Sequence, residues 1–217
     1  MDYTETTTEK VLADLATAKM AFVDEKEGLA RLFDDNTAGV IWHRCMQERM
    51  QSWLDTLPVD QLPTGRIVLP VLKVRSAVTE LMNISKMSDC AERQLLLDDI
   101  CLLAHKSSEL FASTYLRLRF DVLTDNKCAK FHIDHVAARL LCTYRGVGTE
   151  YSFLDDQKRP AEIFHTPNCG AIVLRGTEWP TDCPNNLVHR SPEINDGNET
   201  RLLLIIDAVD DADDKEF

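Results

Sequence analysis

The feature that most constrains the fold is a change in hydrophobic period near residue 116. Residues 116–120 alternate Leu and Arg and end in Phe, a pattern typical of a half-buried strand. Turn residues, such as Asp-Asn at 125–126 and Gly-Val-Gly at 146–148, separate this segment from similar ones. Short strands at this spacing predict a jelly roll or a related barrel. The other expected strands span residues 130–134, 138–144, 162–165, 171–174, 187–189 and 201–207.

The residues before this change follow a helical period. Apolar side chains recur at helical spacing in the expected helices. The run 39–42 predicts a strand or a core-anchoring segment, and two prolines and a glycine predict a loop over 58–66. We therefore expect an α+β chain, with a mainly helical N-terminal region (1–113) packed on a jelly-roll barrel (114–209) and an acidic tail (210–217). The expected helices span residues 8–33, 44–56, 74–82 and 91–111.

The charge balance argues against several kinds of partner. Lys and Arg number 24 against 36 Asp and Glu, so the formal net charge is −12, which disfavours binding to nucleic acid or to an anionic membrane surface. No stretch approaches the ~20 apolar residues of a membrane-spanning helix. The polar, acidic N-terminal residues are unlike a secretory signal. The seven cysteines include no CxxC pair, which predicts reduced thiols in a cytoplasmic protein.

A His-x-Asp pair in the expected barrel is the strongest chemical signal. On a strand, residues two apart point to the same face, so His132 and Asp134 would offer an imidazole nitrogen and a carboxylate oxygen side by side. His189, on a later expected strand, is the best candidate for a third ligand. This hypothesis requires the three side chains to lie within ~7 Å of one another, since metal–ligand bonds are only about 2.0–2.2 Å long.

Arg201 extends this pattern, because it opens the apolar run 202–206. A guanidinium at the mouth of an apolar barrel needs an anionic partner, since an unpaired buried charge is costly. It can hold a carboxylate through two parallel hydrogen bonds. Two His, one carboxylate and a carboxylate-binding Arg are the parts of a non-haem Fe(II) oxygenase site, in which the metal keeps open positions for a co-substrate and O₂.

The order of these residues resembles the iron- and 2-oxoglutarate-dependent oxygenases of the double-stranded β-helix fold. Between the motifs, the strand and Gly-rich turn at 139–150 and the Pro-Gly turn and strand at 167–174 resemble the corresponding segments of that family. The resemblance covers roughly residues 115–207, which implies a double-stranded β-helix for the C-terminal half.

The resemblance also implies roles for individual residues. It makes His132, Asp134 and His189 ligands of Fe(II). Arg201 would be the catalytic-site residue that holds the distal carboxylate of 2-oxoglutarate, and Tyr144 would also lie in the cofactor pocket. The family often has a small hydroxyl residue two positions after this Arg, where this chain has Leu203. This departure affects the co-substrate more than the metal.

More closely, the whole chain resembles a bacterial family of unknown function whose genes are often associated with zinc-homeostasis genes. The shared runs are Lys130-Phe131-His132-x-Asp134 and the segment 141–150. This resemblance keeps a second reading open: a non-catalytic zinc-binding protein that uses the same pocket, with or without Cys128. His and carboxylate ligands suit both iron and zinc, so the residue types alone do not choose between them.

Two further alternatives remain. His132 and Asp134 could simply hydrogen-bond one another at a strand end, which would leave a metal-free barrel acting as an interaction module. His135 would point to the opposite face of the strand, where it is a surface residue more readily than a ligand. No aromatic cage, basic groove or nucleotide motif identifies the substrate, which could be a small molecule or a protein.

Overall fold

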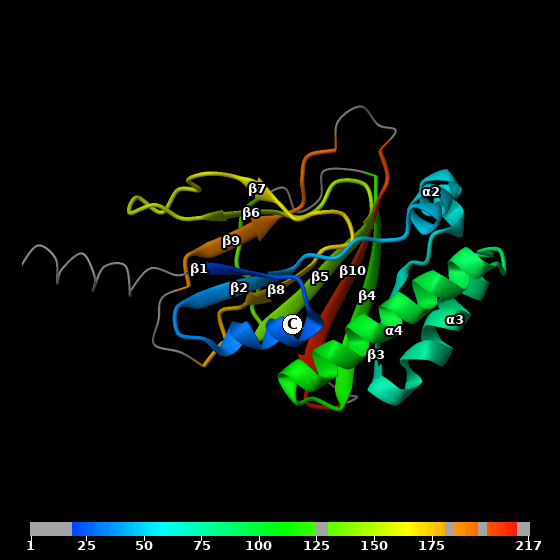
Figure 1. Ribbon diagram of the computed structural model, residues 1–217, viewed down its shortest axis with the longest axis horizontal. Helices are drawn as coiled ribbons and strands as arrows, with labels where there is room; N and C mark the ends of the chain where they lie inside the picture. Colours follow the sequence, from blue (N-terminus) through cyan, green and yellow to red (C-terminus); the bar gives the residue numbers. More distant parts are fainter. Residues whose placement is uncertain (1–18, 125–129, 181–184, 195–198, 212–217) are drawn as a thin grey trace, which may run out of the picture.

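The computed structural model describes residues 19–124, 130–180, 185–194 and 199–211. This part of the chain is a mixed α/β fold made mostly of strands (Figure 1). A large sheet lies at the centre, a small sheet packs on one of its faces, and the α-helices pack on the other.

The central sheet has seven strands in the order β1-β2-β8-β5-β10-β4-β3. Neighbouring strands are antiparallel, except that β1 and β2 run parallel. Strands far apart in the sequence are thereby side by side: β2 pairs with β8, and β10 pairs with both β4 and β5. The bounds are β1 Lys19–Val23, β2 Thr37–Trp42, β3 Gly65–Pro70, β4 Tyr115–Leu123, β5 Ala138–Arg145, β8 Ala171–Arg175 and β10 Arg201–Val209.

The small sheet has three strands in the order β7-β6-β9. They are β6 Glu150–Phe153, β7 Phe164–His165 and β9 Leu187–Arg190. Tyr151 of β6 and Leu187 of β9 belong to a buried apolar cluster with Ile41 and Ile172 of the central sheet. This packing holds β9 in a fixed place beside the central sheet.

The helices cover the other face of the central sheet (Figure 1). Ile100 and Leu103 of the longest helix are fully buried, in the same apolar cluster as Leu140 of β5 and Leu204 of β10. The α-helices are α2 Glu48–Thr56, α3 Val74–Ile84 and α4 Ala91–Phe111, and three 3₁₀ segments span η1 Lys26–Phe33, η2 Val59–Gln61 and η3 Val71–Lys73.

This layered arrangement explains why residues 202–206 of β10 are apolar without interruption. Leu204 and Ile206 face the helices, whereas Leu203 and Ile205 belong to the cluster on the opposite face. A strand buried on both faces needs apolar residues at every position, not at alternate ones. Arg201 and Asp207 of the same strand are also buried, so their charges need a local explanation.

Much of the predicted secondary structure is confirmed. The helices expected at 44–56, 74–82 and 91–111 correspond to α2, α3 and α4. The strands expected at 116–120, 138–144, 171–174, 187–189 and 201–207 correspond to β4, β5, β8, β9 and β10, and the one expected at 162–165 shortens to the two residues of β7.

The N-terminal predictions are partly wrong. The helix expected at 8–33 lies outside the described residues up to residue 18, and the rest of it is strand β1 and the 3₁₀ segment η1. The loop expected at 58–66 ends early, because Gly65 begins β3, which pairs with β4. Three strands from residues 1–113 therefore join the central sheet, and a separate helical N-terminal part packed on a jelly roll is not confirmed. The division at residue 113 stays a prediction.

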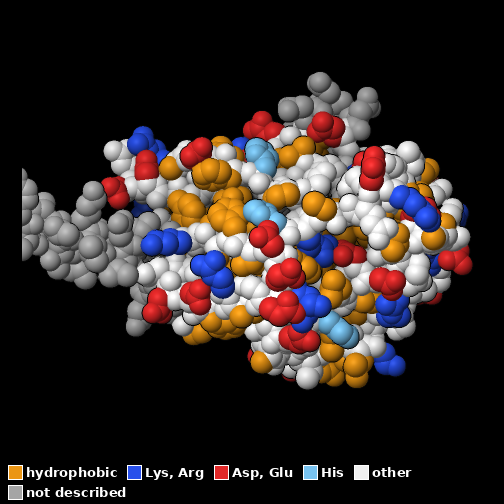
Figure 2. All heavy atoms as spheres, viewed as in Figure 1, with side chains coloured by type: hydrophobic (Ala, Val, Ile, Leu, Met, Phe, Trp, Pro, Cys, Tyr) orange, Lys and Arg blue, Asp and Glu red, His pale blue; other side chains and the backbone are white. Residues whose placement is uncertain are grey.

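The surface and the helices bear on the expected partners. Within the described ranges, none of the helices has the combined length and apolar character that crossing a membrane requires. Acidic and basic side chains are interspersed over the described part of the face drawn in Figure 2. On this face, the negative net charge of the chain is not gathered into one patch.

Candidate metal centre

A single backbone bridge brings two histidines together. Residues 130–134 are not the strand that the sequence predicts, but His132 pairs with His189 of β9, each backbone N–H donating to the other residue's carbonyl at 3.0 Å. Side chains of directly opposed residues project to the same side of such a pair. The two imidazole rings accordingly lie with their centroids 4.5 Å apart.

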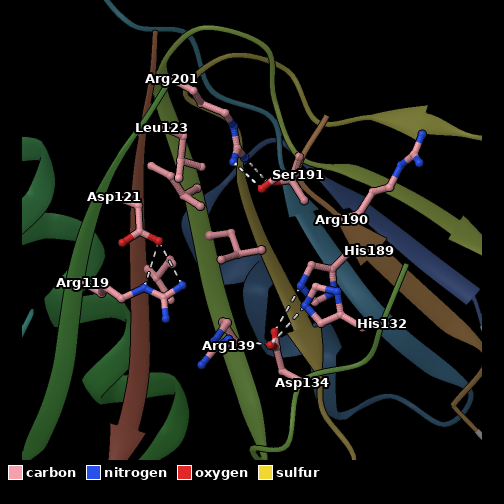
Figure 3. A pocket seen from close by; sticks show the side chains of 14 residues that line it. Arg119, Asp121, Leu123, His132, Asp134, Arg139, His189, Arg190, Ser191 and Arg201 are labelled. Atoms are coloured by element: carbon pink, nitrogen blue, oxygen red, sulfur yellow. Dashed lines mark hydrogen bonds and ion pairs between the residues drawn. The ribbon is translucent and has the colours of Figure 1, made fainter. Parts of the chain in front are cut away.

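Asp134 completes the group, as Figure 3 shows. Its Oδ2 lies 3.1 Å from Nε2 of His189, and its Oδ1 lies 3.6 Å from Nε2 of His132. One candidate ligand atom from each of the three residues lies within 4.8 Å of the other two. The three side chains selected from the sequence are therefore well inside the separation that a shared metal requires.

The hydrogen bond of His132 fixes which ring nitrogen is free. Nδ1 lies 2.9 Å from the carbonyl oxygen of Lys130. A carbonyl can only accept, so Nδ1 carries the proton and donates it, and Nε2 keeps its lone pair. This lone pair is on the nitrogen nearer to Asp134, as a metal ligand requires.

The three groups shift one another's pKa values. The contact with Asp134 raises the pKa of His132, whereas burial lowers the pKa of His189. Burial acts to raise the pKa of Asp134, but the adjacent imidazoles of His132 and His189 and the charge of Arg139 outweigh it and hold that pKa well below its usual range. Asp134 is therefore ionised at neutral pH and offers an anionic oxygen.

The carboxylate of Asp134 has one satisfied and one unsatisfied oxygen. Arg139 of β5 donates to Oδ1 at 2.5 Å. Oδ2 is buried and accepts no hydrogen bond from the described residues. Nε2 of His189 lies 3.1 Å from it, but the two atoms are not aligned for a hydrogen bond. An orphaned carboxylate oxygen in a buried place is costly. A divalent cation between Oδ2 and the two Nε2 atoms would satisfy all three, so the residues fit a metal.

Arg201 lies at the other end of the same pocket, and the hydrogen-bond acceptors that it has in the described part of the chain are neutral. It is 2% exposed, and it donates to the carbonyl of Val147 at 2.9 Å and to the hydroxyls of Ser191, Thr143 and Thr149 at 3.2, 3.0 and 2.7 Å. Burial lowers the pKa of Arg201 to about 10. Among the described residues no carboxylate contacts this buried guanidinium, which makes it a ready binding site for an anion.

The Gly-rich turn is shaped around this arginine. Gly148 approaches Thr166 so closely that a Cβ on it would lie 1.9 Å from the Thr166 carbonyl oxygen, and Gly146 has a φ of +82°. Only glycine fits these two positions. The turn therefore brings both Val147 and Thr149 onto Arg201.

The pocket between the two ends is partly apolar. Leu141, Leu203 and Ile205 line it, together with the metal-ligand candidates and Arg201 (Figure 3). Leu203 stands where the oxygenase family often has a small hydroxyl residue, but Thr143, Thr149 and Ser191 supply hydroxyls to the guanidinium from other segments. An anion bound to Arg201 would lie in the same pocket as the three metal-ligand candidates, with these apolar side chains lining the space between them.

A family model described as "Protein of unknown function (DUF1826)" matches residues 23–207. The chain belongs to this family. The resemblance to a family of unknown function is thus confirmed, whereas an association with zinc homeostasis is not shown. No curated protein matches the sequence of this DUF1826 protein.

Solved structures with a similar fold include two plant dioxygenases. The dioxygenase for auxin oxidation 1 from Arabidopsis thaliana, in a 2-oxoglutarate binary complex, aligns with a TM-score of 0.57 at 11% identity, over 92% of this chain and 95% of that chain. The dioxygenase for auxin oxidation in rice aligns with a TM-score of 0.50 at 12% identity, over 88% of this chain and 83% of that chain. At these identities the likeness is one of fold alone: the DUF1826 protein resembles the 2-oxoglutarate oxygenase fold.

Tyr144 does not join the other candidate residues of the DUF1826 protein. It is fully buried among the helix-facing residues of β5, and its hydroxyl donates to Asp99 of α4 at 2.6 Å. Arg44 binds both oxygens of the same Asp99. Tyr144 follows Thr143 on the strand, so it points to the opposite face from the pocket. Its expected place in the cofactor pocket is corrected accordingly to a place in the helix–sheet interface.

The remaining candidates have different surroundings. His135 lies on the surface, where its ring contacts Thr177 and Glu178 and not the metal-ligand candidates. Cys128 lies outside the described residues. Neither Arg139 nor Thr143 is among the site residues predicted from the sequence, although their spacing of four on one strand places both on one face.

Proposed function

We propose that this DUF1826 protein is a non-haem Fe(II)- and 2-oxoglutarate-dependent oxygenase of the hydroxylase type, built on a double-stranded β-helix. In this proposal His132, Asp134 and His189 hold Fe(II) as a two-His-one-carboxylate triad, which leaves metal positions open for co-substrate and O₂. The grouping of their ligand atoms within 4.8 Å supports the metal, and the likeness of fold to a dioxygenase solved with 2-oxoglutarate supports the reaction class.

The proposal that 2-oxoglutarate is the co-substrate rests on the buried guanidinium of Arg201. Among the described residues its hydrogen-bond acceptors are one carbonyl and three hydroxyls, and it lines the same pocket as the triad. A dicarboxylic keto acid fits this arrangement, because its distal carboxylate can pair with Arg201 while the keto-acid end reaches the metal. The pairing removes the cost of an uncompensated buried charge.

The chain's own residues orient and shield the reactants. Iron with 2-oxoglutarate and O₂ supplies the oxidising power. Arg201 and the hydroxyls around it fix the position of the co-substrate carboxylate, and the apolar side chains of Leu141 and Leu203 keep water from the space between. His132 stays in one tautomer because its Nδ1 proton is held by the Lys130 carbonyl. The substrate itself is unidentified, and a cytoplasmic location and the absence of nucleic-acid partners stay predictions from the sequence.

Metal analysis of anaerobically purified protein, wild type beside His189→Ala, tests the metal. We expect near-stoichiometric iron in the wild type and its loss in the variant. Addition of 2-oxoglutarate to the Fe(II) form should then produce a visible charge-transfer band that Arg201→Gln lacks. Tightly held zinc and no response to 2-oxoglutarate would overturn this proposal and favour the zinc-binding reading.

A further inference from the structure

A row of buried charges crosses the central sheet beneath the proposed metal centre. In the register of the sheet, Asp207 of β10 lies opposite Arg117 of β4 on one side and Arg139 of β5 on the other. The three side chains are 2%, 5% and 7% exposed. Charged groups this deeply buried are rare unless each is paired.

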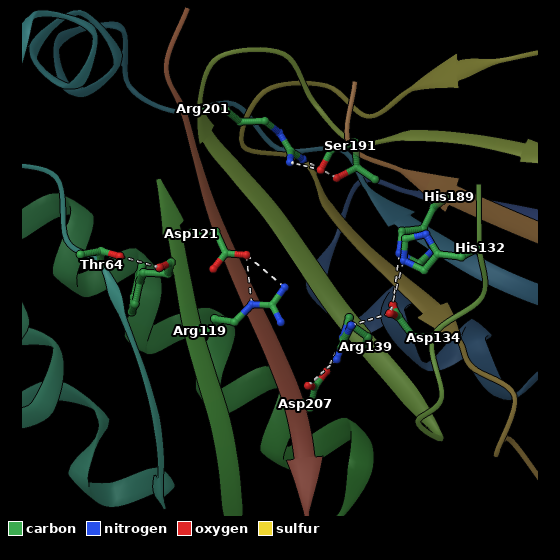
Figure 4. A network of polar contacts seen from close by, with 12 residues as sticks. Thr64, Arg119, Asp121, His132, Asp134, Arg139, His189, Ser191, Arg201 and Asp207 are labelled. Atoms are coloured by element: carbon green, nitrogen blue, oxygen red, sulfur yellow. Dashed lines mark hydrogen bonds and ion pairs between the residues drawn. The ribbon is translucent and has the colours of Figure 1, made fainter. Parts of the chain in front are cut away.

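Arg139 is the member of this row that reaches the metal centre, as Figure 4 shows. Its Nε and Nη2 donate to the two oxygens of Asp207 at 2.6 and 2.8 Å, a bidentate pair. Its Nη1 donates to Oδ1 of Asp134 at 2.5 Å. One rigid, planar guanidinium therefore joins a residue of β10 to the carboxylate of the triad.

A gain in stability does not account for this arrangement. Buried ion pairs seldom stabilise a fold more than apolar side chains of similar volume would. The geometry does account for the state of Asp134: with Oδ1 held by Arg139, only Oδ2 stays without a hydrogen bond, on the side of the imidazoles.

We infer that Arg139, held in place by Asp207, is a positioning residue that fixes the orientation of the Asp134 carboxylate and makes it bind the metal through Oδ2 alone. The inference rests on the metal site proposed above. Hydrogen bonds to ligating carboxylates orient them, and loss of such partners typically weakens metal binding about 10- to 100-fold.

The direction in which metal affinity changes when Arg139 is replaced distinguishes a positioning role from a purely electrostatic one. Arg139 is a cation close to the metal site, so its Coulomb field alone would weaken metal binding, and its removal would tighten it. A positioning role predicts the opposite result. Arg139→Lys is also informative, because lysine keeps the charge but lacks the planar fork that contacts two carboxylates at once.

Arg119 provides a matched control. It lies on β4, lines the same pocket, and pairs with Asp121 at 3.0 Å. Within the part of the chain that the structure describes, no hydrogen bond or ion pair joins it to Asp134, so Arg119→Gln removes a nearby positive charge without touching the ligand carboxylate.

The test is a calorimetric titration of the apo full-length protein with Mn(II), together with the visible spectrum of the Co(II) form and the melting temperature of the apo form. We expect Arg139→Gln and Arg139→Lys to weaken Mn(II) binding about 10- to 100-fold and to change the Co(II) bands. Asp207→Asn should weaken binding less, and Arg119→Gln should leave it unchanged or slightly tighter. If Arg139→Gln does not fold, the same measurements on Arg139→Lys and Asp207→Asn test the inference.

The outcomes are distinct for this inference and for the proposed function. Wild-type protein that binds no Mn(II) or Co(II) would refute the metal site, and the inference with it. Wild-type binding with equal or tighter binding in both Arg139 variants would refute the positioning role alone. A lower apo melting temperature with unchanged Mn(II) affinity would assign Arg139 to stability only, which also overturns the inference.

Discussion

Replacement of Arg201 by Met should strongly weaken co-substrate binding while leaving the stability of the apo protein almost unchanged. Met is unbranched and fills the space of the arginine stem, so the change removes mainly the guanidinium. The two effects differ because the guanidinium has only neutral acceptors among the residues that the structure describes, but would gain a carboxylate when 2-oxoglutarate binds.

The structure gives the scale of both effects. A lowering of the Arg201 pKa from 12.5 to about 10 corresponds to a cost of about 3 kcal/mol for burying the charge in the folded protein, at 1.36 kcal/mol per pKa unit. The four hydrogen bonds that the variant loses are worth roughly 1 kcal/mol each, and acceptors that line a pocket regain water. These terms nearly cancel, so the melting temperature should stay within about 4 °C of wild type. Truncation of one partner of a buried charge pair costs about 2–5 kcal/mol, so 2-oxoglutarate affinity should fall about 30- to 4,000-fold.

The assay is a calorimetric titration of the Mn(II)-loaded protein with 2-oxoglutarate, beside thermal melting of the apo form. Arg119→Met serves as the control, since Arg119 is paired with Asp121 within the same pocket. A large loss of apo stability in Arg201→Met, with 2-oxoglutarate binding intact, would contradict the reasoning. It would mean that the guanidinium is a structural link and not an anion site.

Three further changes test the surroundings of the site. Gly148→Ala should weaken 2-oxoglutarate binding in the same titration, because its Cβ would meet the Thr166 carbonyl at 1.9 Å and displace the turn; unchanged affinity would count against that turn's role. Tyr144→Phe should leave that affinity unchanged and lower the free energy of unfolding by about 1.5–3 kcal/mol in urea denaturation, since it loses a hydrogen bond to the Asp99 carboxylate. Burial raises the pKa of Cys142 from 9.0 to about 12, so the folded state holds this proton more tightly than the unfolded state does. Stability should therefore fall as pH rises from about 9 towards 12, and melting curves of Cys142→Ala should show a shallower fall; equal slopes would contradict this.

The fold could be predicted where local pattern and tertiary setting agree. The alternation at 116–120 and the apolar stripe of 91–111 each specify one kind of element, and β4 and α4 form there. The prediction failed at 19–23 and 65–70, where β1 and β3 gain their strand character from pairing with β2 and β4. Such pairing depends on residues distant in the sequence, so the local hydrophobic period does not indicate it.

The candidate site was predictable in its residue types and less so in its surroundings. The spacing of His132 and Asp134 was informative although no strand forms there, because one bridge to His189 is enough to align the side chains. Tyr144 was misplaced because resemblance selects a motif but not a strand face. The hydroxyls around Arg201 come from three separate segments, which only the folded chain brings together.

The most direct test of the proposed site is a crystal structure of the protein with Mn(II) and 2-oxoglutarate bound, with the metal located by anomalous scattering. We expect one strong peak at about 2.0–2.2 Å from Nε2 of His132, Oδ2 of Asp134 and Nε2 of His189, and a carboxylate of the ligand paired with Arg201. A metal bound elsewhere, or a 2-oxoglutarate molecule that does not contact Arg201, would contradict it.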